Sequence, residues 1–394
     1  MGRLNGTEIT VLGAGVAGLA LAVALARRGA AVTVLEQAEA IREVGAGLQI
    51  TPNGAAVLRA LGLAEALAVA GPQAQAVELR DGYAGGTVLR MDLAKLRPGL
   101  SWHLMHRADL IGLLAEAARA AGVQIRLLQK IETVDLSGDA PRLVTAQGAE
   151  LRPAILIGAD GLHSRLRAAL NGAVAPFFTR QVAWRAVIPE TADIAPVAEV
   201  HMGAGRHVVS YPLRGGQMRN IVAVEERNRW VDEGWNLRDD PLALRLAFED
   251  FGPRVRGWLE QVEDLWLWGL FRHPVAEHWG RVLPGGFTAI LGDAAHPTLP
   301  FLAQGANMAL EDAWVLADLL ARHGPGEAAL TAYTRARAPR CAKIVAAANS
   351  NARAYHLRGI TREVAHLGLR IGGKVAPGAG LARYDWVHGF DATA

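Results

Sequence analysis

Three glycines near the start of the chain have the spacing of a phosphate-binding turn. Gly13, Gly15 and Gly18 form the pattern G-x-G-x-x-G. They directly follow the apolar, β-branched run Thr7–Leu12, which we expect to be a buried strand. Gly13 makes the tight turn, Gly15 lets the backbone approach a pyrophosphate, and Gly18 lets a helix pack on the strand. The spacing therefore predicts a dinucleotide-binding site.

The residues that follow supply the rest of such a site. We expect a helix over Val16–Arg28, whose free N-terminal N–H groups bind phosphate, and a second strand over Ala31–Leu35. Glu36 ends that strand, where a carboxylate accepts hydrogen bonds from a ribose. The uncharged stretch Ile9–Ala26 is also long enough for a transmembrane helix, but its glycines and the strand–turn–helix order favour the dinucleotide site. The motif does not distinguish NAD from FAD.

Two further acidic residues follow expected strands. Asp160 comes after the apolar run 154–158 and Asp293 after the run Phe287–Leu291. In α/β folds, ligands bind at the carboxyl ends of parallel strands, so both are candidate ligand contacts. An alternative for Asp160 is a helix-capping role, since Ser164 begins the next helix.

Two expected helix starts are candidate anion sites. The helix beginning at Gly305, Ala306 and Asn307 presents free amides to negative charge. Arg107, just before an expected helix over Ala108–Ala121, either reaches a phosphate or is a surface cation. The glycine-containing loop 41–54 is expected to lie against a cofactor.

A third group of polar residues lies in the middle of the chain. His207 and Tyr211 share one face of an expected strand, and a histidine has a pKa suited to accepting a proton near neutral pH. The alternative is a surface histidine and a core tyrosine. Arg185 and Arg219 could bind a carboxylate in a bidentate manner, although a structural surface cation is the favoured interpretation of each.

Composition limits the class of protein. The chain has 394 residues, 51% hydrophobic and 20% charged, with a net charge of +3 and no long basic run, which excludes a nucleic-acid-binding surface. The one cysteine, Cys341, fits a reducing compartment, and no metal-ligand spacing occurs. Because the first strand begins by Thr7, no signal peptide is expected, and we expect a cytoplasmic protein.

The remaining pattern predicts a second lobe and a helical C-terminus. Alternating strands between Pro176 and Trp279, with one helix in 240–259, indicate an antiparallel sheet. The other expected elements are a hairpin over Val77–Leu89, a three-strand meander over Val123–Leu128, Ile131–Asp135 and Arg142–Thr145, and helices over Glu327–Arg335, Arg340–Tyr355 and Thr361–Arg370. We expect the tail after Gly372 to be less ordered, and no amphipathic basic helix near the C-terminus.

Three segments occur in a distinctive order: G-x-G-x-x-G with its acid, G-A-D-G-L-H-S-R-L-R, and G-D-A-A-H-P. This triple resembles the single-component FAD-dependent aromatic hydroxylases (group A flavoprotein monooxygenases), and most of all the salicylate, 3-hydroxybenzoate and 6-hydroxynicotinate hydroxylases. The resemblance covers about Glu8 to Tyr355. It implies an α/β fold with a Rossmann-like FAD-binding domain of the glutathione-reductase type, an inserted antiparallel-sheet substrate domain and a helical C-terminus. The implied limits are 1–75, 101–172 and 281–355 for the FAD-binding domain, 76–100 and 173–280 for the substrate domain, and 356–394 for the extension.

The resemblance also implies residue roles. It assigns the FAD pyrophosphate to Gly13, Gly15, Gly18 and Arg107, the adenosine ribose to Glu36, FAD and the pyridine nucleotide to Asp160, the ribityl chain to Asp293, and the flavin pyrimidine edge to Gly305, Ala306 and Asn307. Two positions depart from the common family pattern. Ala303 replaces the first glycine of G-Q-G, as in the hydroxynicotinate and hydroxybenzoate types, and Phe301 stands where relatives can carry a polar ring, on the expected substrate wall.

The implied reaction is hydroxylation of a small aromatic substrate. NADH or NADPH reduces FAD, O2 adds to form a C4a-hydroperoxyflavin, and the ionised ring attacks it. Related hydroxynicotinate enzymes use a histidine and a tyrosine at the spacing of His207 and Tyr211. We expect a monomer or homodimer without stable membrane association. The alternatives are hydroxylation of a lipid-linked quinone precursor or secondary metabolite, urate-type ring oxidation, and a non-catalytic FAD-binding protein.

Overall fold

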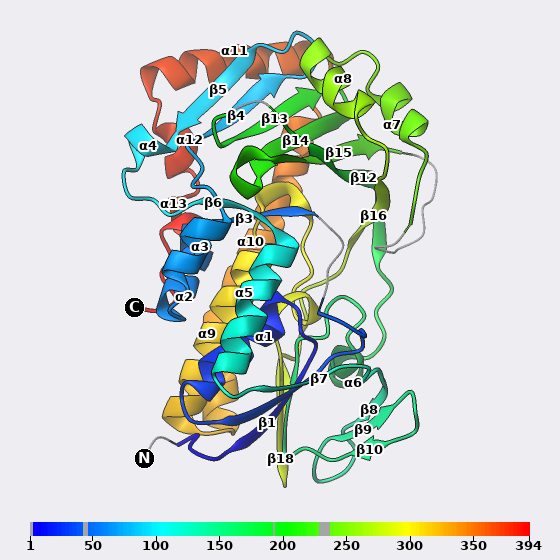
Figure 1. Cartoon of the computed structure of the whole chain (residues 1–394), viewed down its shortest axis with the longest axis vertical. Helices are drawn as coiled ribbons and strands as arrows, with labels where there is room; N and C mark the ends of the chain where they lie inside the picture. Colours follow the sequence, from blue (N-terminus) through cyan, green and yellow to red (C-terminus); the bar gives the residue numbers. More distant parts are fainter. Residues whose placement is uncertain (1–2, 42–45, 192–193, 228–236) are drawn as a thin grey trace.

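The computed structural model describes residues 3–41, 46–191, 194–227 and 237–394, which form two lobes joined by long helices (Figure 1). A parallel sheet occupies the lower lobe in this view, and a larger, mainly antiparallel sheet occupies the upper lobe. Part of the loop 41–54, including Gly45, lies outside the described residues.

The lower sheet has the strand order β17-β18-β11-β1-β2-β7 and is parallel except for its edge strand β17, which pairs antiparallel with β18. Its strands are β1 (Glu8–Leu12), β2 (Ala31–Leu35), β7 (Gln124–Arg126), β11 (Ile155–Gly158), β17 (Gly280–Leu283) and β18 (Gly286–Ile290). The first two pair in parallel across helix α1 (Val16–Ala26), as the glycine motif predicted. Because β1 is central, the loops after β1, β11 and β18 meet at one edge.

The predicted meander was wrong in one strand. The segment around Ile125 pairs in parallel with β2 and extends the parallel sheet, because helix α5 (Arg107–Ala120) delivers it back to that edge. The other two segments, β8 (Ile131–Asp135) and β9 (Arg142–Thr145), pair with β10 (Glu150–Leu151) in a small separate sheet. A local alternation pattern does not say which sheet a short strand joins.

The upper sheet has the strand order β16-β12-β15-β14-β13-β4-β5. Its strands are β4 (Ala76–Asp81), β5 (Thr87–Asp92), β12 (Phe177–Pro189), β13 (Val197–Gly203), β14 (Arg206–Leu213), β15 (Met218–Glu226) and β16 (Trp266–Arg272). The predicted hairpin β4–β5 joins it through parallel pairing of β4 with β13. The upper sheet is therefore built from two segments of the chain, β4–β5 and β12–β16, which lie before and after the lower-lobe strands β7 and β11.

The single helix expected within 240–259 is two helices. They are α7 (Pro241–Ala247) and α8 (Pro253–Glu260). Gly252 and Pro253 break the helical pattern, because proline lacks an N–H and starts a new helix at its first turn. Both helices cover the outer face of the upper sheet, where Phe248 meets Trp184 edge-on at a centroid distance of 6.1 Å.

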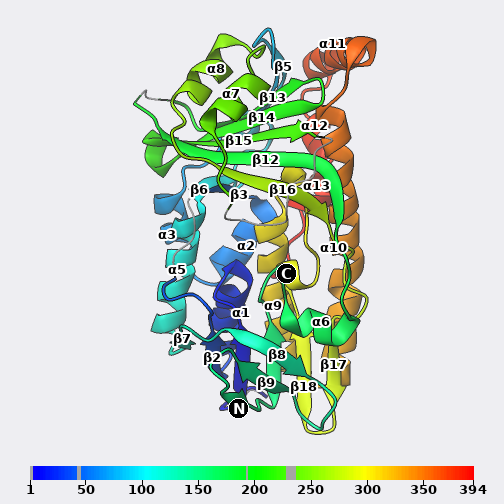
Figure 2. The ribbon, with the colours of Figure 1, turned by 90° about the vertical axis from the view of Figure 1, so that its right-hand side faces the viewer.

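Two long helices connect the lobes. Helix α9 (Gly305–His323) packs on α1, and α10 (Glu327–Tyr355) runs the length of the molecule (Figure 2). We predicted a break in α10 near Pro339, and this was wrong. The helix continues through the proline because buried side chains on both sides, Arg337 and Cys341, fix its packing.

The tail was also predicted wrongly. It forms the short helices α12 (Ala379–Ala382) and α13 (Asp385–His388), and it buries Leu381 and Val387. Arg340 of α10 donates to the carbonyls of Trp386 and Val387 at 2.9 Å each. These bonds tie the tail against the molecule although its sequence is rich in glycine.

Helix α11 (Gly359–Val375) lies against β5 at the end of the upper lobe and contradicts the expectation of no amphipathic helix there. One of its faces is apolar and exposed, and Arg370 and Lys374 flank that face. Within the described part of the chain, no helix is both long and apolar enough to cross a membrane. The elements not yet named are β3 (Gly47–Ile50), β6 (His103–His106), α2 (Pro52–Ala60), α3 (Ala64–Ala70), α4 (Leu93–Leu96) and α6 (Arg165–Asn171).

Candidate active site

The glycine turn after β1 has the geometry of a phosphate cradle. Gly13 has a φ of +94°, and a Cβ there would lie 2.5 Å from the carbonyl oxygen of Ala159. A Cβ on Gly18 would lie 1.9 Å from the carbonyl oxygen of Gly13. A Cβ on Gly15 would meet no atom within 4 Å, so the backbone there is open to a ligand. These three environments match the three roles that a bound pyrophosphate requires.

Glu36 lies beside this turn. Its carboxylate accepts a hydrogen bond from the Ala14 amide at 2.7 Å and another from the Ala38 amide at 2.9 Å. The carboxylate therefore stands at the edge of the cradle, where a ribose hydroxyl would meet it. Its role toward a ribose stays a prediction.

Arg107 and Asp293 line one large cavity that begins at the glycine turn. Arg107 is the first residue of α5, one position earlier than expected, and its amide donates to the Ala46 carbonyl. Asp293 lies in the 3-10 helix η2 (Gly292–Ala294) after β18. Burial raises the pKa of Asp293, while the positive charges of His296 and Arg107 oppose that rise. Both residues are placed to contact a dinucleotide.

Asp160 has the alternative role considered for it. Its carboxylate accepts from the Ser164 hydroxyl at 2.6 Å and from the Arg165 amide at 2.8 Å, at the start of α6. Ser164 in turn accepts from the Arg167 amide. The neighbours Ala159 and Gly161, rather than Asp160, line the cavity. Asp160 thus fixes the turn that the ligand would touch.

The first residues of α9 face the cavity with their backbone, whereas the Asn307 side chain bonds to a neighbouring segment. Gly305 and Ala306 line the cavity, and helix geometry leaves the first amides without intrahelical acceptors. The Asn307 side chain is fully buried, accepts from the Thr51 amide and donates to the Gln49 carbonyl, each at 3.0 Å. The Asn307 side chain therefore holds the strand β3 against the helix, and its expected contact with the flavin stays a prediction.

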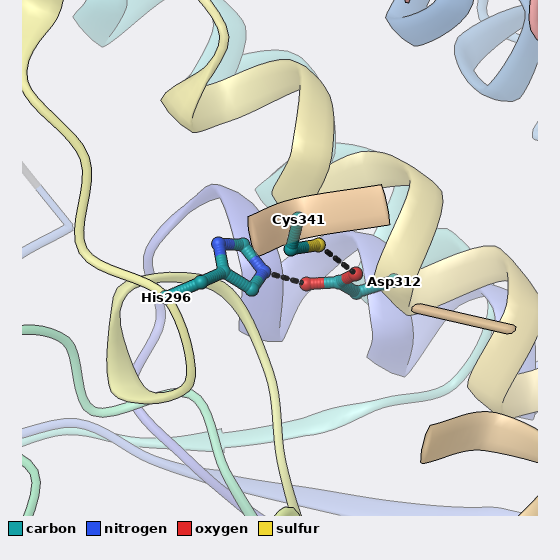
Figure 3. Close-up of side chains that lie close together, drawn as sticks. All are labelled: His296, Asp312 and Cys341. Atoms are coloured by element: carbon teal, nitrogen blue, oxygen red, sulfur yellow. Dashed lines mark hydrogen bonds and ion pairs between the residues drawn. The ribbon is translucent and has the colours of Figure 1, made fainter. Parts of the chain in front are cut away.

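A buried charged cluster supports this helix from behind (Figure 3). His296, Asp312 and Cys341 lie with their polar atoms within 4.8 Å of one another, and His296 Nε2 bonds the Asp312 carboxylate. Burial alone would lower the pKa of His296, but the Asp312 carboxylate raises it well above its usual value. Arg337 donates to the other carboxylate oxygen at 2.7 Å. The Asp312 carboxylate thus joins His296, Arg337 and the Gly292 amide, so the cluster braces the turn after β18.

The cavity continues from the glycine turn to the inner face of the upper sheet and has a volume of about 420 Å³. Its far wall comes from strands β12, β14, β15 and β16. A hydrophobic group including Val222, Val224, Leu299 and Phe301 covers much of this wall. A mostly apolar chamber with a few polar groups is typical of a site for an aromatic ring.

His207 and Tyr211 both reach this chamber, as their spacing on β14 predicted. His207 is 1% exposed, and its ring lies 5.7 Å from that of Phe301. Burial lowers the pKa of His207 well below its usual value, and the charge of His356 acts in the same direction. Burial raises the pKa of Tyr211, opposed by the nearby charge of Arg185. These shifts favour the neutral forms of both side chains, in which His207 can accept a hydrogen bond and Tyr211 can donate one.

Arg185 also lines the chamber, on β12. One Nη donates to the Gly47 carbonyl at 2.8 Å, and the guanidinium stacks on Trp268 at 4.4 Å. A Cβ on Gly47 would lie 2.6 Å from the Asn220 side chain, so only glycine lets β3 approach the upper sheet here. Arg185 therefore joins the two lobes at the chamber and adds positive charge to it.

Arg219 does not line the chamber. Asn220 pairs with Tyr211 and so shares the sheet face that Tyr211 turns toward the chamber. Arg219 is the next residue on the strand and therefore points to the opposite face. Its guanidinium is held by Glu190 at 2.8 Å and by stacking on Trp258 at 4.4 Å on the outer face. The structural alternative for Arg219 fits its position.

Sequence reasoning missed several residues of the chamber. Tyr355 at the end of α10, and Leu381, Tyr384 and His388 of the tail, all line it. His388 meets the Trp102 ring edge-on at 4.8 Å, and burial lowers its pKa to about 4. No local pattern marks these residues, because they reach the chamber only through the packing of the C-terminal helices.

Comparison with known proteins agrees with this geometry. A family model described as an FAD binding domain matches residues 6–348. The 3-amino-4-hydroxybenzoate 2-monooxygenase PtmB3 of Streptomyces platensis is 34% identical over 98% of this chain and 97% of its own length. The 3-hydroxybenzoate 6-hydroxylase of Klebsiella oxytoca is 32% identical, with 91% of each covered.

A solved structure extends the likeness to the fold. The structure of Klebsiella pneumoniae HpxO complexed with FAD and uric acid has a TM-score of 0.81 at 24% identity, and the match covers 94% of this chain and 95% of that one. The predicted fold class and cofactor are confirmed. The chain belongs to the FAD-binding family of flavoprotein monooxygenases and is an FAD-dependent aromatic monooxygenase.

Proposed function

We propose that this enzyme uses NADH or NADPH and O2 to hydroxylate a phenolic carboxylic acid of the hydroxybenzoate class. The observation that carries the proposal is one chamber with a neutral histidine and a tyrosine on one strand and an arginine on another. His207 and Tyr211 would meet the phenolic hydroxyl. Arg185 would meet the carboxylate.

The sheet register supports a single ring between these groups. Val209, between His207 and Tyr211, pairs with Val222, which pairs with Arg185. Arg185 is therefore two strands away from β14, or about 10 Å between backbones. We propose that a benzene ring carrying a hydroxyl and a carboxyl lies between these side chains. The relatives' substrates, 3-hydroxybenzoate and 3-amino-4-hydroxybenzoate, are of this kind.

The cofactor's residues fit the same arrangement. The glycine turn, Glu36, Arg107 and Asp293 would hold FAD along the cavity, and the amides of Gly305 and Ala306 would face the flavin next to the chamber. Bound FAD, once reduced, supplies the activation of O2. The protein's own residues orient the ring, exclude water and accept the phenolic proton.

The test is NADH and NADPH oxidation by the FAD-loaded enzyme with a panel of aromatic acids. The panel contains salicylate, 3- and 4-hydroxybenzoate, 3-amino-4-hydroxybenzoate, 6-hydroxynicotinate and urate, with peroxide measured in parallel. Strong stimulation without peroxide by a hydroxybenzoate supports the proposal. Stimulation by urate alone, or by none of them, would contradict it. If a hydroxybenzoate is accepted, Arg185→Gln should raise the KM for that acid more than it lowers kcat.

A further inference from the structure

A chain of hydrogen bonds leads from the chamber to the protein surface. His207 Nδ1 lies 2.7 Å from His356 Nε2, and His356 Nδ1 lies 2.9 Å from a carboxylate oxygen of Glu226. The side chains of His207 and His356 are buried, whereas that of Glu226 is 38% exposed. We propose that these three side chains form a proton relay that carries the substrate's phenolic proton from the chamber to solvent.

The acceptor at the outer end fixes the tautomers. An ionised carboxylate only accepts hydrogen bonds, so His356 carries its proton on Nδ1 and offers a lone pair on Nε2. His207 must then donate from Nδ1 to that lone pair. This leaves the lone pair of His207 Nε2 for a ligand, and among the described residues no hydrogen bond occupies that nitrogen.

The carboxylate of Glu226 is ionised because Arg358 and His356 donate hydrogen bonds to it. Burial alone would raise the pKa of Glu226, but the hydrogen bonds from Arg358 and His356 lower it overall. Arg358 Nη2 lies 2.7 Å from the second carboxylate oxygen and is itself exposed. The Gln181 amide also approaches His356 Nδ1, at 3.4 Å, but the 2.9 Å bond to the charged carboxylate is the stronger one.

The proton balance is simple. The substrate hydroxyl gives its proton to His207 Nε2, the Nδ1 proton of His207 moves to His356 Nε2, and the Nδ1 proton of His356 moves to Glu226 and then to water. One proton leaves the chamber, and the substrate becomes a phenolate. Reverse transfer when the product phenolate is protonated restores the first tautomers. His207 is the residue that touches substrate, and His356 and Glu226 act through it.

The relay rests on the proposed function, because it needs a phenolic ligand. Its test uses the oxidised FAD-loaded enzyme without NADH, and 4-hydroxy-3-nitrobenzoate as the probe, since its phenolate is yellow. Stopped-flow mixing follows the rate at which bound probe ionises. We expect Glu226→Gln and His356→Gln to slow ionisation by about a hundredfold, the lower end of what a positioned acid–base group contributes, with little change in probe affinity.

A rescue experiment separates a relay from a structural role. His356→Ala leaves space for imidazole, and added imidazole should restore fast ionisation to this variant but not to Glu226→Gln. His366→Gln is the matched control, because His366 is a buried histidine that lies 3.4 Å from the Asp81 carboxylate in another part of the upper lobe. Ionisation at the wild-type rate in Glu226→Gln, or equal slowing in His366→Gln, would overturn the relay.

The two proposals fail differently. If the wild type ionises the probe through the relay but hydroxylates no acid of the panel, the proposed function is wrong and the relay stands. If the wild type hydroxylates a hydroxybenzoate while the relay variants ionise the probe normally, the relay is wrong and the proposed function stands.

A second inference comes from α11, at the far end of the upper lobe. Five side chains recur every three or four residues and are exposed on one helical face: Ile360 82%, Val364 64%, Leu367 57%, Ile371 55% and Val375 80%. A contiguous exposed apolar stripe of this kind marks an interaction surface. We infer that the stripe pairs with the same stripe of a second copy of this chain.

The spacing of the stripe is symmetric. About the point between Leu367 and Gly368, Ile360 is the mirror position of Val375, and Val364 is that of Ile371. Two such helices packed antiparallel across a two-fold axis therefore place Ile360 against Val375 and Val364 against Ile371 on both sides of the axis, with Leu367 over Gly368 at the centre. Gly368 at the centre has no atom within 4 Å of a Cβ position, so the helices can approach closely there.

The charges flanking the stripe are complementary in the same arrangement. At 100° per residue, Glu363, Arg370 and Lys374 all lie on one flank of the stripe. A two-fold axis brings this flank against itself in reverse order, so Glu363 of one copy lies opposite Arg370 and Lys374 of the other. The Glu363 side chain is 65% exposed and pairs with Arg362 of its own helix at 2.6 Å, and in the dimer its second carboxylate oxygen would face the partner's cations. A membrane surface would not require this alternation of charge sign.

Cross-linking tests this pairing directly. Gly368→Cys places a thiol beside the two-fold axis, and the native Cys341 is buried. Mild oxidation of the FAD-loaded variant should give a covalent dimer. Gly257→Cys, on the open surface of α8, is the matched control and should stay monomeric.

Sedimentation of the wild type at rising concentration should show a dimer that Leu367→Lys dissociates. Glu363→Lys should weaken the dimer, and adding Arg370→Glu and Lys374→Glu should restore it. A monomer at every concentration, dimers unaffected by Leu367→Lys, or binding of the wild type to phosphatidylglycerol vesicles through α11 in place of dimers would overturn the inference.

Discussion

At the residue scale, the environment of a side chain decides its chemistry more than its type does. His207 and His296 are both buried histidines, yet burial next to His356 lowers the pKa of the first, and burial next to Asp312 raises that of the second. The first is therefore a neutral ring that offers a lone pair, and the second holds its proton more tightly than a free histidine does.

His207 is the residue on which coupled hydroxylation should depend most. His207→Ala should leave FAD bound but lower product formation by about a hundredfold, because the phenolic proton loses its acceptor. Peroxide release per NADH should rise. The check is product and peroxide measured together, with His201→Ala as the control, since His201 is equally buried but bonds Glu199 away from the chamber. Unchanged product yield in His207→Ala would refute the role.

Asp293 should govern FAD retention instead. Asp293→Ala removes a carboxylate at the cofactor side of the cavity, and loss of a charged hydrogen bond weakens binding by about tenfold to a hundredfold. The flavin content after gel filtration and an FAD titration measure this. Asp264→Ala, a change of an exposed residue, should retain FAD fully. A fully flavinylated Asp293→Ala protein would contradict the prediction.

At the scale of elements, helix α9 links the two halves of the site. Its first turn faces the cavity, and its middle carries Glu311 and Asp312, which Arg337 of α10 binds at 2.6 and 2.7 Å. The same aspartate holds His296 and the Gly292 amide, and so fixes the turn that carries Asp293. One buried network thus positions both the strand-end acid and the helix start.

This network predicts a pH dependence of stability. The pKa of His296 is raised by folding, so its stabilising effect is complete below about pH 6.5 and is lost as the pH rises through the folded-state value. Above about pH 6.5 the free energy of unfolding should fall by up to about 1.4 kcal/mol per pH unit from this group alone.

Melting curves between pH 6 and pH 9 measure this dependence of stability on pH. His296→Gln should melt at a lower temperature at pH 6 and show a flatter decline at higher pH. The exposed histidine variant His323→Gln should follow the wild type. A His296→Gln profile parallel to that of the wild type would refute the assignment.

At the scale of the whole molecule, the C-terminal tail completes the substrate chamber. Tyr384 donates to Asn351 of α10 at 2.6 Å, and both residues line the cavity. The tail thus closes a chamber whose far wall is formed by strands from the middle of the chain. Leu381 and His388 pack beside Trp102 on the substrate side of the cavity, whereas Val387 joins the core of the lower lobe.

Removal of residues 377–394 should therefore affect the substrate more than the cofactor. We expect the KM for the aromatic acid to rise by about tenfold, equivalent to about 1.4 kcal/mol, and peroxide release to increase as water enters the chamber. FAD content should stay near the wild-type level. His388→Ala, a milder change of the same wall, should move both quantities in the same direction, whereas loss of FAD with an unchanged KM would contradict the prediction.

Several features of the fold and the site could be predicted from short stretches of sequence. The phosphate cradle is such a feature, because the glycine positions, the helix start and the acid at the next strand all lie within Thr7–Glu36. The placement of His207 and Tyr211 on one face is another, since a strand's two-residue period is a local property.

Other features depended on packing between distant segments. Arg185 reaches the chamber and Arg219 does not, because strand register and the helices on the outer face decide which side is covered. His356 meets His207 only where the end of α10 crosses the upper sheet. The sequence by itself determined the glycine turn and the acid beside it, where backbone geometry is local. Only the tertiary structure decided the substrate chamber, because its walls are contacts between side chains far apart in the chain.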